Sequence, residues 1–423
     1  MQTLNIGSRG TRVMEIQALL NKLGYDVGVI DGIYGIKTAG AVQRFQRYFG
    51  LQPTGVVNDD TYKLMNRFLI GYDTYRIRPG DTLYLIARRY GATVPNIITA
   101  NPQINFKNLQ VGKAIIVPYS LDVVYTNIDY TYDIMKKNLE GLKARYPFIE
   151  VSSGGMSELG KELYYVKLGN GPNKVFYNGS HHAIEWITTV LLMKFIENFA
   201  KAYASGENIE GYNALDIWNK STIYVMPMVN PDGVDLVING LDRSNPYYND
   251  LIKWNKGSLD FSKTWSANIR GVDLNHNYDA MWQKSKDAEK SYGVYGPGPT
   301  RYSGTSPESE SESKAVADFT RKNDFRLVIA YHSQGEVIYW NFQNLASAEA
   351  RRIAVIFSGL SGYELGEPTG ITSYAGYKDW FIEKYRRPGY TIEVGLGVNP
   401  LPISQFNKIY KDNIKVLLEG ALV

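Results

Sequence analysis

The sequence contains no cysteine. Disulfide bonds, thiolate metal sites and cysteine nucleophiles are therefore excluded, and a bound transition metal would need histidine and carboxylate ligands. Histidine is scarce as well: the chain has four, all beyond residue 180, and this scarcity makes each of them informative. They are His181, His182, His276 and His332.

Long apolar stretches and a strong charge imbalance are also absent. No run of about 18 apolar residues occurs, so no transmembrane helix is expected. Residues 1–7 show no basic segment followed by an apolar one, so no secretory signal is visible. The 46 basic and 42 acidic side chains leave a formal charge of +4, which does not indicate a nucleic-acid-binding protein.

The chain is long enough to form several globular domains. A length of 423 residues predicts roughly two to four domains. Hydrophobic residues make up 44% and charged residues 21% of the chain, as in ordinary globular proteins, so a sizeable core is available.

Residues 1–71 are expected to form a small all-α bundle. Apolar residues recur at helical spacing over Val13–Leu23, Thr38 is placed to cap a second helix, and Asp59–Phe68 is predicted as a third. The turn Asp31–Gly35, with the Leu-Gly-Tyr before it and the Ala-Val-Gln-Arg-Phe-Gln after it, resembles the peptidoglycan-binding domain 1 family. A generic three-helix bundle is the alternative interpretation.

Residues 72–120 are expected to form a small α+β module with a strand, two short helices and a second strand. Arg78–Leu83 (Arg-Pro-Gly-Asp-Thr-Leu) leads into the first helix, and Asn101-Pro102 ends the second. These motifs resemble the LysM module. The resemblance implies binding to glycans that contain N-acetylglucosamine.

Residues 121–423 show short apolar strands that alternate with helices, which favours an α/β domain. Lys174–Asn178 is predicted as a buried strand and Thr188–Ala200 as a helix. Ser311–Lys322 is predicted as another helix, and the acidic run at 306–313 as its solvated start.

Three residues of this last region form a candidate metal site. His182 and Glu185 are three residues apart at the start of a predicted helix, so both side chains can reach one ion. A catalytic zinc needs three protein ligands and one open position. His332 follows the apolar strand Leu327–Tyr331, at the strand end where open α/β sheets place their sites.

Glu393 is a candidate general base. It lies in the apolar strand segment Tyr390–Val394, where a carboxylate is costly to bury unless it has a partner or a task. One interpretation is a salt-bridged structural residue. The favoured interpretation is a base that takes a proton from the attacking water in a metal-assisted hydrolysis.

Five motifs occur in the order typical of the zinc carboxypeptidase family, which the chain resembles from about residue 125 onward. They are Asn178–Trp186, Asn230–Val234, Gly271–Asn277, Tyr331–Ser333 and Thr391–Glu393. The resemblance implies a carboxypeptidase-like α/β domain with a mixed sheet. It also implies one zinc ion on His182, Glu185 and His332, with Glu393 as general base.

The same resemblance suggests further site residues. Asp273 matches the carboxylate that orients the first zinc histidine. Tyr374 is the candidate for the family's mobile active-site tyrosine, and Arg270 for the group that stabilises the oxyanion. His181 is one position away from the ligand spacing and is interpreted as a neighbour of the metal site.

Two departures from the family pattern concern the substrate. Family members carry Asn-Arg where this chain has Asn275-His276, and histidine cannot reproduce the two-pronged pair of that arginine with a C-terminal carboxylate. A second family arginine is replaced by Ile184. Cleavage next to a different anionic group, or inside a chain, is therefore favoured over ordinary removal of a C-terminal residue.

The domain order resembles that of the bacterial γ-D-glutamyl-L-diamino acid endopeptidases, which cut the γ-D-Glu–diaminopimelate bond of peptidoglycan stem peptides. Asn275, His276 and Lys378 are predicted to bind the extra amine and carboxylate of the diamino acid. For Lys378 the alternative is a solvent-exposed surface lysine.

The sequence thus predicts a multidomain zinc peptidase of the bacterial cell wall or spore, with peptidoglycan as its partner. One alternative is a wall-tethered carboxypeptidase, which the absence of arginine at His276 argues against. Another is a non-catalytic wall-binding protein, which would need the loss of a metal ligand or of Glu393. A glycan hydrolase is disfavoured because no second pair of catalytic carboxylates is evident.

Overall fold

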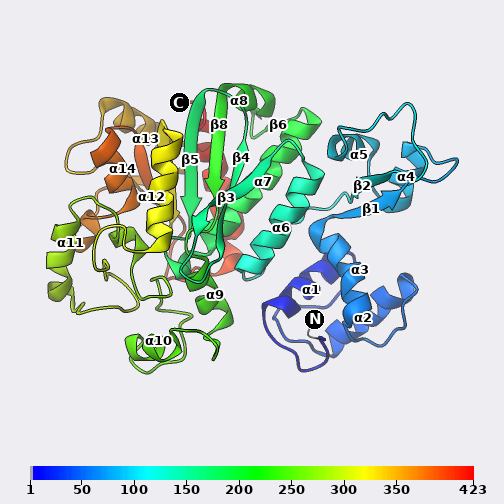
Figure 1. Ribbon diagram of the computed structural model, residues 1–423, viewed down its shortest axis with the longest axis horizontal. Coiled ribbons are helices and arrows are strands. Elements are labelled where there is room, and N and C mark those ends of the chain that lie inside the picture. The colour runs from blue at the N-terminus through cyan, green and yellow to red at the C-terminus, as the bar shows by residue number, and fades with distance from the viewer. Residues whose placement is uncertain (1–2) are drawn as a thin grey trace. The chain divides into compact units, whose positions relative to one another are not determined.

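The computed structural model describes residues 3–423 (Figure 1). The chain divides into two compact units, Met1–Glu150 and Val151–Val423. In the part of the chain that is described, no helix is long and apolar enough to cross a membrane.

The first unit begins with three helices, as the apolar spacing predicts. They are α1 (Thr11–Lys22), α2 (Ile36–Tyr48) and α3 (Asp59–Ile70). The expectation that Thr38 caps α2 is wrong: Gly35 precedes the helix, and Thr38 is buried inside it. Its hydroxyl accepts a hydrogen bond from Gln17 Nε2 (3.2 Å), so this threonine satisfies a buried amide instead of a helix end.

A strand–helix–helix–strand module follows in the same unit. It consists of β1 (Tyr72–Arg76), α4 (Leu83–Tyr90), α5 (Val94–Ala100) and β2 (Ala114–Pro118), and β1 pairs with β2 antiparallel. Asn101, which ends α5, is buried. Its side chain donates to the carbonyls of Ile97 and Ile116 (both 2.7 Å), which links the second helix to the second strand.

The helix α6 (Tyr132–Arg145) also belongs to the first unit. A Cβ added at Gly141 would lie 2.2 Å from the carbonyl oxygen of Ile70, so this close approach to the end of α3 requires glycine. Lys137 pairs with Glu15 at 2.6 Å. The expected start of the third region at residue 121 stays a prediction.

The second unit is built on an eight-stranded mixed sheet in the order β11-β10-β12-β9-β5-β8-β4-β3. The strands are β3 (Glu150–Met156), β4 (Glu162–Leu168), β5 (Asn173–Gly179), β8 (Ser221–Met226), β9 (Leu327–His332), β10 (Val337–Tyr339), β11 (Glu364–Gly366) and β12 (Gly389–Glu393). The predicted α/β class with a mixed sheet is confirmed.

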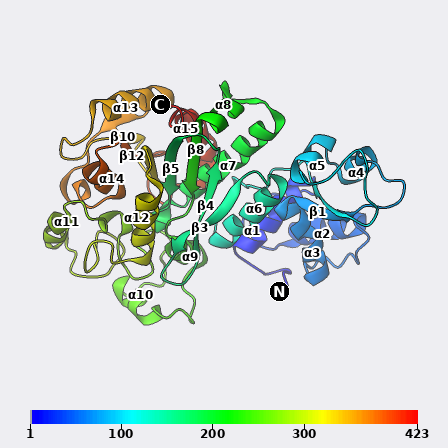
Figure 2. The same cartoon turned by 45° about the horizontal axis from the view of Figure 1, so that its top comes forward.

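Helices cover both faces of this sheet, and the strands lie between α12 and α7 in two views (Figures 1 and 2). The longer helices are α7 (Ile187–Ser205), α9 (Pro231–Asn239), α12 (Ser311–Asn323), α13 (Ala348–Ser361), α14 (Tyr377–Tyr385) and α15 (Phe406–Glu419). The shorter ones are α8 (Ala214–Lys220), α10 (Tyr248–Trp254) and α11 (Trp282–Ala288), and a small hairpin joins β6 (Asn208–Ile209) to β7 (Tyr212–Asn213).

Alternation along β5 explains the two covered faces. Phe176 packs on Phe319 of α12, with ring centroids 5.3 Å apart. Its neighbour Tyr177 points to the opposite face, where its hydroxyl donates to the carbonyl of Leu417 in α15 (2.9 Å). Side chains on both faces of β5 are therefore apolar and covered by helices. This is why the strand appears in the sequence as a continuous run of large hydrophobic residues.

The acidic run at residues 306–313 is not the solvated helix start that the sequence predicts. Glu310 and Glu312 are buried, at 1% and 0% exposure. Asn268 Nδ2 donates to both carboxylates, at 2.9 Å to Glu310 and 3.2 Å to Glu312, and the Glu158 amide also donates to Glu312. The run is therefore part of a buried polar network, which charge pattern alone did not reveal.

This burial predicts a pH-dependent stability. Burial raises the pKa of Glu312 to about 8, above the usual 4.5, so between these two pH values the folded protein binds a proton that the unfolded chain does not. The free energy of unfolding should therefore fall as pH rises from 5 to 8, by on the order of 4 kcal/mol from this group. Glu312→Gln should remove most of this fall in chemical denaturation at pH 5, 6.5 and 8.

Glu364→Gln serves as the matched control because Glu364 is exposed on β11 of the same sheet. The control should keep the wild-type pH slope. Equal slopes for wild type and Glu312→Gln would show that Glu312 is already ionised in the folded protein.

Candidate active site

Three neighbouring parallel strands bring the predicted residues to one edge of the sheet. β5 pairs with β9 and β9 with β12, all parallel. Glu393 lies in register opposite His332, and Gly179 opposite Tyr331, so the three strands end at one level. Because carboxyl ends of parallel strands meet at one edge, His182, just beyond β5, joins this group.

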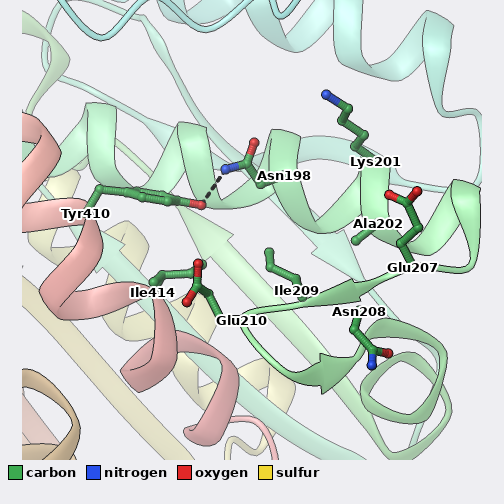
Figure 3. Close-up of a pocket in the computed structure, with 9 residues that line it drawn as sticks. All are labelled: Asn198, Lys201, Ala202, Glu207, Asn208, Ile209, Glu210, Tyr410 and Ile414. Carbon is green, nitrogen blue, oxygen red and sulfur yellow. Dashed lines mark hydrogen bonds between the residues drawn. The ribbon is translucent and has the colours of Figure 1, made fainter.

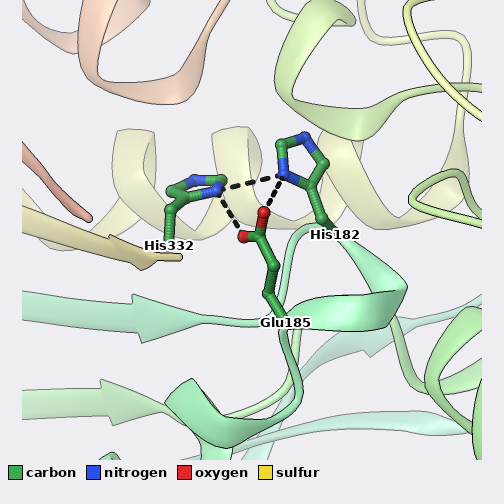
Figure 4. Close-up of side chains that lie close together, drawn as sticks. All are labelled: His182, Glu185 and His332. Atoms are coloured by element: carbon green, nitrogen blue, oxygen red, sulfur yellow. Dashed lines mark hydrogen bonds and ion pairs between the residues drawn. The ribbon is translucent and has the colours of Figure 1, made fainter. Parts of the chain in front are cut away.

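His182, Glu185 and His332 converge on one point (Figure 4). His182 Nδ1 lies 2.9 Å from Glu185 Oε1, and His332 Nδ1 lies 3.0 Å from Glu185 Oε2. The two Nδ1 atoms are only 3.3 Å apart. Nitrogen lone pairs and a carboxylate that face one another in this way fit a shared cation, and they are the atoms that zinc takes as ligands.

Asp273 fixes the orientation of the first histidine. His182 Nε2 lies 3.0 Å from Asp273 Oδ1. The other oxygen, Oδ2, accepts from the Arg301 amide at 2.8 Å and from the Thr300 hydroxyl at 3.1 Å. With Nε2 carrying the proton, the lone pair of His182 Nδ1 faces Glu185 and is free to bind a metal.

The charges of this group are strongly coupled. Burial disfavours the ionised form of Glu185, but the charge and hydrogen bond of His182 outweigh it and lower the pKa of Glu185 to about 2. Burial likewise opposes the charged form of His182, while Glu185 and Asp273 raise the pKa of this imidazole well above its usual value. A cation bound at the ligand atoms would supply the positive charge that the His182 imidazolium supplies to these carboxylates, and the proton on His182 Nδ1 would leave.

Glu393 lies beside this group, partly exposed to a pocket that His182 also lines. Burial first, and then the negative charge of Glu185, raise the pKa of Glu393 well above its ordinary value. A raised pKa makes this carboxylate a stronger proton acceptor, and a cation held by Glu185 would relieve the repulsion between the two.

The pocket has a volume of about 160 Å³. Besides His182 and Glu393 it is lined by Asn275, His276, Tyr339, Pro368, Thr372, Gly376, Lys378, Asp379 and Thr391. One pocket is therefore lined by a candidate metal ligand, the candidate base and all three residues that the sequence predicts as substrate-binding.

The sequence model of the zinc carboxypeptidase family matches residues 135–416 of this chain. The chain belongs to the zinc carboxypeptidase family. Models of a peptidoglycan binding domain and of the LysM domain match residues 9–65 and 75–118. The chain is therefore a zinc peptidase, with two N-terminal modules whose families bind peptidoglycan.

Known relatives agree with this assignment. The chain is 41% identical to gamma-D-glutamyl-L-diamino acid endopeptidase 1 of Lysinibacillus sphaericus, over 81% of this chain and 98% of the relative. It is 34% identical to the uncharacterized protein YqgT of Bacillus subtilis (strain 168), over 68% of this chain and 76% of that protein.

A solved structure of thrombin activatable fibrinolysis inhibitor shares the fold, with a TM-score of 0.55 and 18% identity, over 83% of this chain and 98% of the other. Carboxypeptidase A from Helicoverpa armigera aligns with a TM-score of 0.53 and 16% identity, over 99% of this chain and 96% of the other. At these identities the likeness concerns the fold alone.

Within this zinc carboxypeptidase fold, His276 stands at the position where the family resemblance implies an arginine. It is buried, and its Nδ1 lies 3.1 Å from the Ser285 hydroxyl. Burial lowers the pKa of this imidazole, although Asp273 opposes the shift, so the ring is uncharged at neutral pH. Position 276 therefore supplies no cation for a terminal carboxylate.

Asn275 and Lys378 line the same pocket, but they are held differently. Asn275 Oδ1 accepts from the Tyr377 amide (3.0 Å), so its carbonyl oxygen supports the start of α14. Lys378 is 3% exposed, which excludes the interpretation as a solvent-exposed surface lysine. The ammonium of Lys378 pairs with Asp379 and with the carbonyl of Asn341.

Arg270 and Tyr374 are not among the residues that line the pocket. The Arg270 guanidinium pairs with Glu158 (3.6 Å) and Glu310 (3.8 Å). Tyr374 packs on the core, and the Lys284 ammonium lies 5.6 Å from its ring centroid. Their roles at the oxyanion and as the mobile tyrosine stay predictions.

His181 is a buried neighbour of the metal group. Its Nε2 lies 2.9 Å from the Tyr278 hydroxyl, and its ring stacks on His332 at 5.5 Å between centroids. Burial lowers the pKa of His181 well below its usual value, so the ring is neutral. His181 therefore packs against His332 and contributes none of the converging ligand atoms.

Sequence reasoning missed Asn399. Its Nδ2 donates to Glu185 Oε1 (3.4 Å) and to the Ser333 carbonyl (2.5 Å), while its Oδ1 accepts from the Ser333 hydroxyl (2.8 Å). The asparagine therefore ties the loop after β12 to a candidate ligand and to the residue after His332. An isolated Asn-Pro pair carries no signal for this role, which depends on tertiary contact.

Asn399→Ala is expected to weaken zinc binding by about 10-fold, because outer partners that orient metal ligands typically contribute 10- to 100-fold. Zinc affinity can be measured by competition with a chromogenic chelator. Asn407→Ala, on an exposed residue further along the same segment, is the control and should bind zinc like wild type. Equal affinities of both variants would show that Asn399 only shapes its loop.

A second hollow lies elsewhere in this unit and has a volume of about 260 Å³ (Figure 3). It is formed by α7, the β6–β7 hairpin and α15, and Asn198 Nδ2 donates to the Tyr410 hydroxyl there (2.7 Å). None of the predicted site residues lines it, so it gives no support to a second catalytic centre.

Proposed function

We propose that the protein hydrolyses the γ-D-glutamyl–diamino acid bond in peptidoglycan stem peptides. The observation that carries the proposal is the buried imidazole of His276, whose pKa burial lowers, at the position where the resemblance to carboxypeptidases implies an arginine. The 41% identity to an endopeptidase named for this bond and the two wall-binding modules support it.

In this proposal His182, Glu185 and His332 hold one zinc ion. Their converging Nδ1 and carboxylate atoms fit a tetrahedral site with an open position. Zinc, when bound, polarises the scissile carbonyl and increases the acidity of water. Asp273 keeps the tautomer of His182 that leaves Nδ1 available.

Glu393 accepts a proton from the attacking water and returns it to the leaving amine. Its position beside His182 in the pocket, and its raised affinity for a proton, suit this exchange. In the ground state Arg270 is held by two carboxylates, so a role at the oxyanion requires it to leave them. Tyr374 would likewise have to turn from the core toward the substrate.

Asn275, His276 and Lys378 bind the diamino acid side of the substrate. All three line the pocket beside the metal group. The amide hydrogens of Asn275 and the imidazole of His276 offer neutral hydrogen bonds, whereas Lys378 brings a positive charge. This set combines neutral hydrogen bonds with one positive charge, which suits the extra amine and carboxylate of a diamino acid.

The N-terminal modules tether the enzyme to its substrate. In this proposal LysM binds the glycan strands, and the first module binds the same wall polymer. Attachment to an insoluble polymer raises the local concentration of stem peptides to about the millimolar range without any new contact in the active site. The proposed location is the bacterial cell wall, including the spore wall.

A wall-tethered carboxypeptidase is the second candidate function, because the chain belongs to the zinc carboxypeptidase family. The enzyme is incubated with L-Ala-γ-D-Glu-diaminopimelate and, separately, with an α-linked peptide that has a free C-terminus. Products are identified by mass spectrometry, with and without a zinc chelator.

Chelator-sensitive cleavage after D-Glu, with the α-linked peptide intact, is the expected result. Loss of single C-terminal residues from the α-linked peptide would instead establish a carboxypeptidase. Absence of cleavage in zinc-loaded protein with both substrates would favour a wall-binding protein without activity.

A further inference from the structure

The second ring nitrogen of His332 has no hydrogen-bond partner in the part of the chain that the structure describes. His332 is 0% exposed, and its Nδ1 faces Glu185 and His182, whereas its Nε2 is buried without a partner. A metal-binding histidine almost always donates its other ring N–H to a carboxylate, a carbonyl or a water. His182 follows this pattern through Asp273. The structure therefore leaves the corresponding acceptor for His332 to be identified.

Two other side chains near His332 are buried with polar atoms that no described residue satisfies. Asn178 is 0% exposed, and neither its Oδ1 nor its Nδ2 is hydrogen-bonded within residues 3–423. His181 is equally buried; its Nε2 lies 2.9 Å from the Tyr278 hydroxyl, but its Nδ1 has no partner among the same residues. Buried polar groups are normally hydrogen-bonded, so each of these atoms requires a partner.

The alternation of side chains places Asn178 and His332 on the same face of the sheet. Asn178 of β5 lies in register opposite Ala330 of β9, and His332 follows Ala330 by two residues. Paired residues of neighbouring strands, and residues two apart on one strand, point to the same face. A strand spacing of about 4.8 Å and a rise of about 3.3 Å per residue put the two Cα atoms roughly 8 Å apart. Polar atoms on two such side chains can share one water between them.

Aromatic rings cover this part of the sheet. Phe176, two residues before Asn178 on the same face of β5, meets the Tyr377 ring edge-on, with centroids 6.1 Å apart. The Tyr377 ring stacks on His181 at 5.9 Å, and His181 stacks on His332 at 5.5 Å. Because Asn178 lies between Phe176 and the end of the strand, this row of rings covers it and excludes bulk solvent.

The chemistry of the unpartnered atoms selects the ligand. When Nδ1 of His332 binds a metal, Nε2 carries the proton and donates, whereas the Asn178 carboxamide offers one acceptor oxygen and two donor hydrogens. A water can accept from the histidine and donate to the carboxamide oxygen at the same time, and a buried water typically has two to four polar partners. A cation does not suit this place, because the N–H groups of both side chains would face it.

We infer that Asn178 and His332 bind one buried water, which accepts from His332 Nε2–H and donates to Asn178 Oδ1. Asn178 is then a positioning residue. Through the water it maintains the tautomer of His332 whose Nδ1 lone pair faces Glu185, as Asp273 does directly for His182. The inference rests on the zinc ligation by His332 in the proposed function, and it does not depend on which peptide bond is cleaved.

The first measurement is the zinc affinity of the full-length protein, determined by competition with a chromogenic chelator. Asn178→Leu keeps the approximate size of the side chain but has no acceptor. It should weaken zinc binding about 10-fold, since groups that orient metal ligands typically contribute 10- to 100-fold. Asn178→Asp keeps acceptor oxygens at the same place and should bind zinc like wild type.

Asn413→Leu is the matched control. Asn413 lies on α15, is also 0% exposed and likewise has an Oδ1 that no described residue satisfies. Its Nδ2 donates to the Tyr363 hydroxyl and the Ile409 carbonyl. This variant should lower the midpoint of chemical denaturation and leave zinc affinity unchanged, because α15 covers the opposite face of the sheet from Asn178.

The second measurement observes the water and the tautomer directly by NMR. Protein with ¹⁵N-labelled histidine has only four imidazoles to assign. In the zinc-loaded wild type, the Nε2–H proton of His332 should be visible and should show cross-relaxation with a bound water. Asn178→Leu should lose this cross-relaxation. A purely structural role of Asn178 would change the denaturation midpoint and leave both the proton signal and zinc affinity as in wild type.

Wild-type zinc affinity in Asn178→Leu, or a His332 Nε2–H with no water beside it, would overturn the inference. His332→Ala, measured in parallel, separates this failure from failure of the proposed zinc site. If His332→Ala also binds zinc like wild type, His332 is not a ligand and the proposed site itself is wrong. If Asn178→Leu does not unfold cooperatively, the NMR signal of the wild-type protein alone decides.

Discussion

Glu393→Gln is expected to lower kcat by on the order of 10³-fold while zinc stays bound, because general-base catalysis typically contributes 10²- to 10⁴-fold. Glutamine keeps the shape of the side chain but cannot accept the proton of the attacking water. Glu393 is also not one of the three converging ligand residues, so the metal site should survive. The measurement is steady-state kinetics on L-Ala-γ-D-Glu-diaminopimelate, with zinc content determined by mass spectrometry.

Glu364→Gln, which changes an exposed glutamate on the edge strand β11, controls for the loss of one negative charge. It should retain wild-type kcat. A Glu393→Gln enzyme with full zinc and near wild-type kcat would mean that another group accepts the proton, and the structural interpretation of Glu393 as a strand residue would then stand.

His332→Ala should remove activity together with zinc. Loss of a direct ligand is expected to weaken zinc binding by more than the roughly 100-fold typical of outer partners. His332 is fully buried, and its Nδ1 faces both Glu185 and His182, so no solvent ligand can take its exact place without repacking. Zinc affinity is measured by chelator competition, and activity across a zinc titration.

His276→Ala is the matched control for histidine loss, since His276 lines the pocket but does not join the converging ligand atoms. It should bind zinc like wild type and change only the substrate kinetics. Zinc affinity that falls equally in both variants would place His276 among the metal ligands, and unchanged affinity in His332→Ala would remove His332 from them.

The strands and the metal group were predictable because short patterns determine them. The short apolar run Leu327–Tyr331 predicts a buried strand, and it lies in β9 (Leu327–His332) in the structure. His182 and Glu185 lie three residues apart, so one turn of backbone brings both side chains to the same side. These features depend on neighbours in the chain, which a sequence displays directly.

Other features depend on contacts between distant segments, and local sequence patterns predicted these features weakly or wrongly. Glu310 and Glu312 belong to a run that looks solvated, yet Asn268, some forty residues earlier in the chain, hydrogen-bonds both carboxylates in the interior. Asn399 reaches Glu185 across 214 positions. No local pattern encodes such a partner.

By itself the sequence determined the fold class, the family and the set of candidate ligands, because these are carried by periodicity, turn residues and closely spaced motifs. Only the tertiary structure decided that Lys378 is buried against Asp379 and that His276 is buried, which lowers the pKa of its imidazole. Burial changes the free energy of a charge, and burial is a property of everything that packs around a residue rather than of its neighbours in sequence. The substrate preference of this peptidase therefore depends on how the residues around its pocket pack.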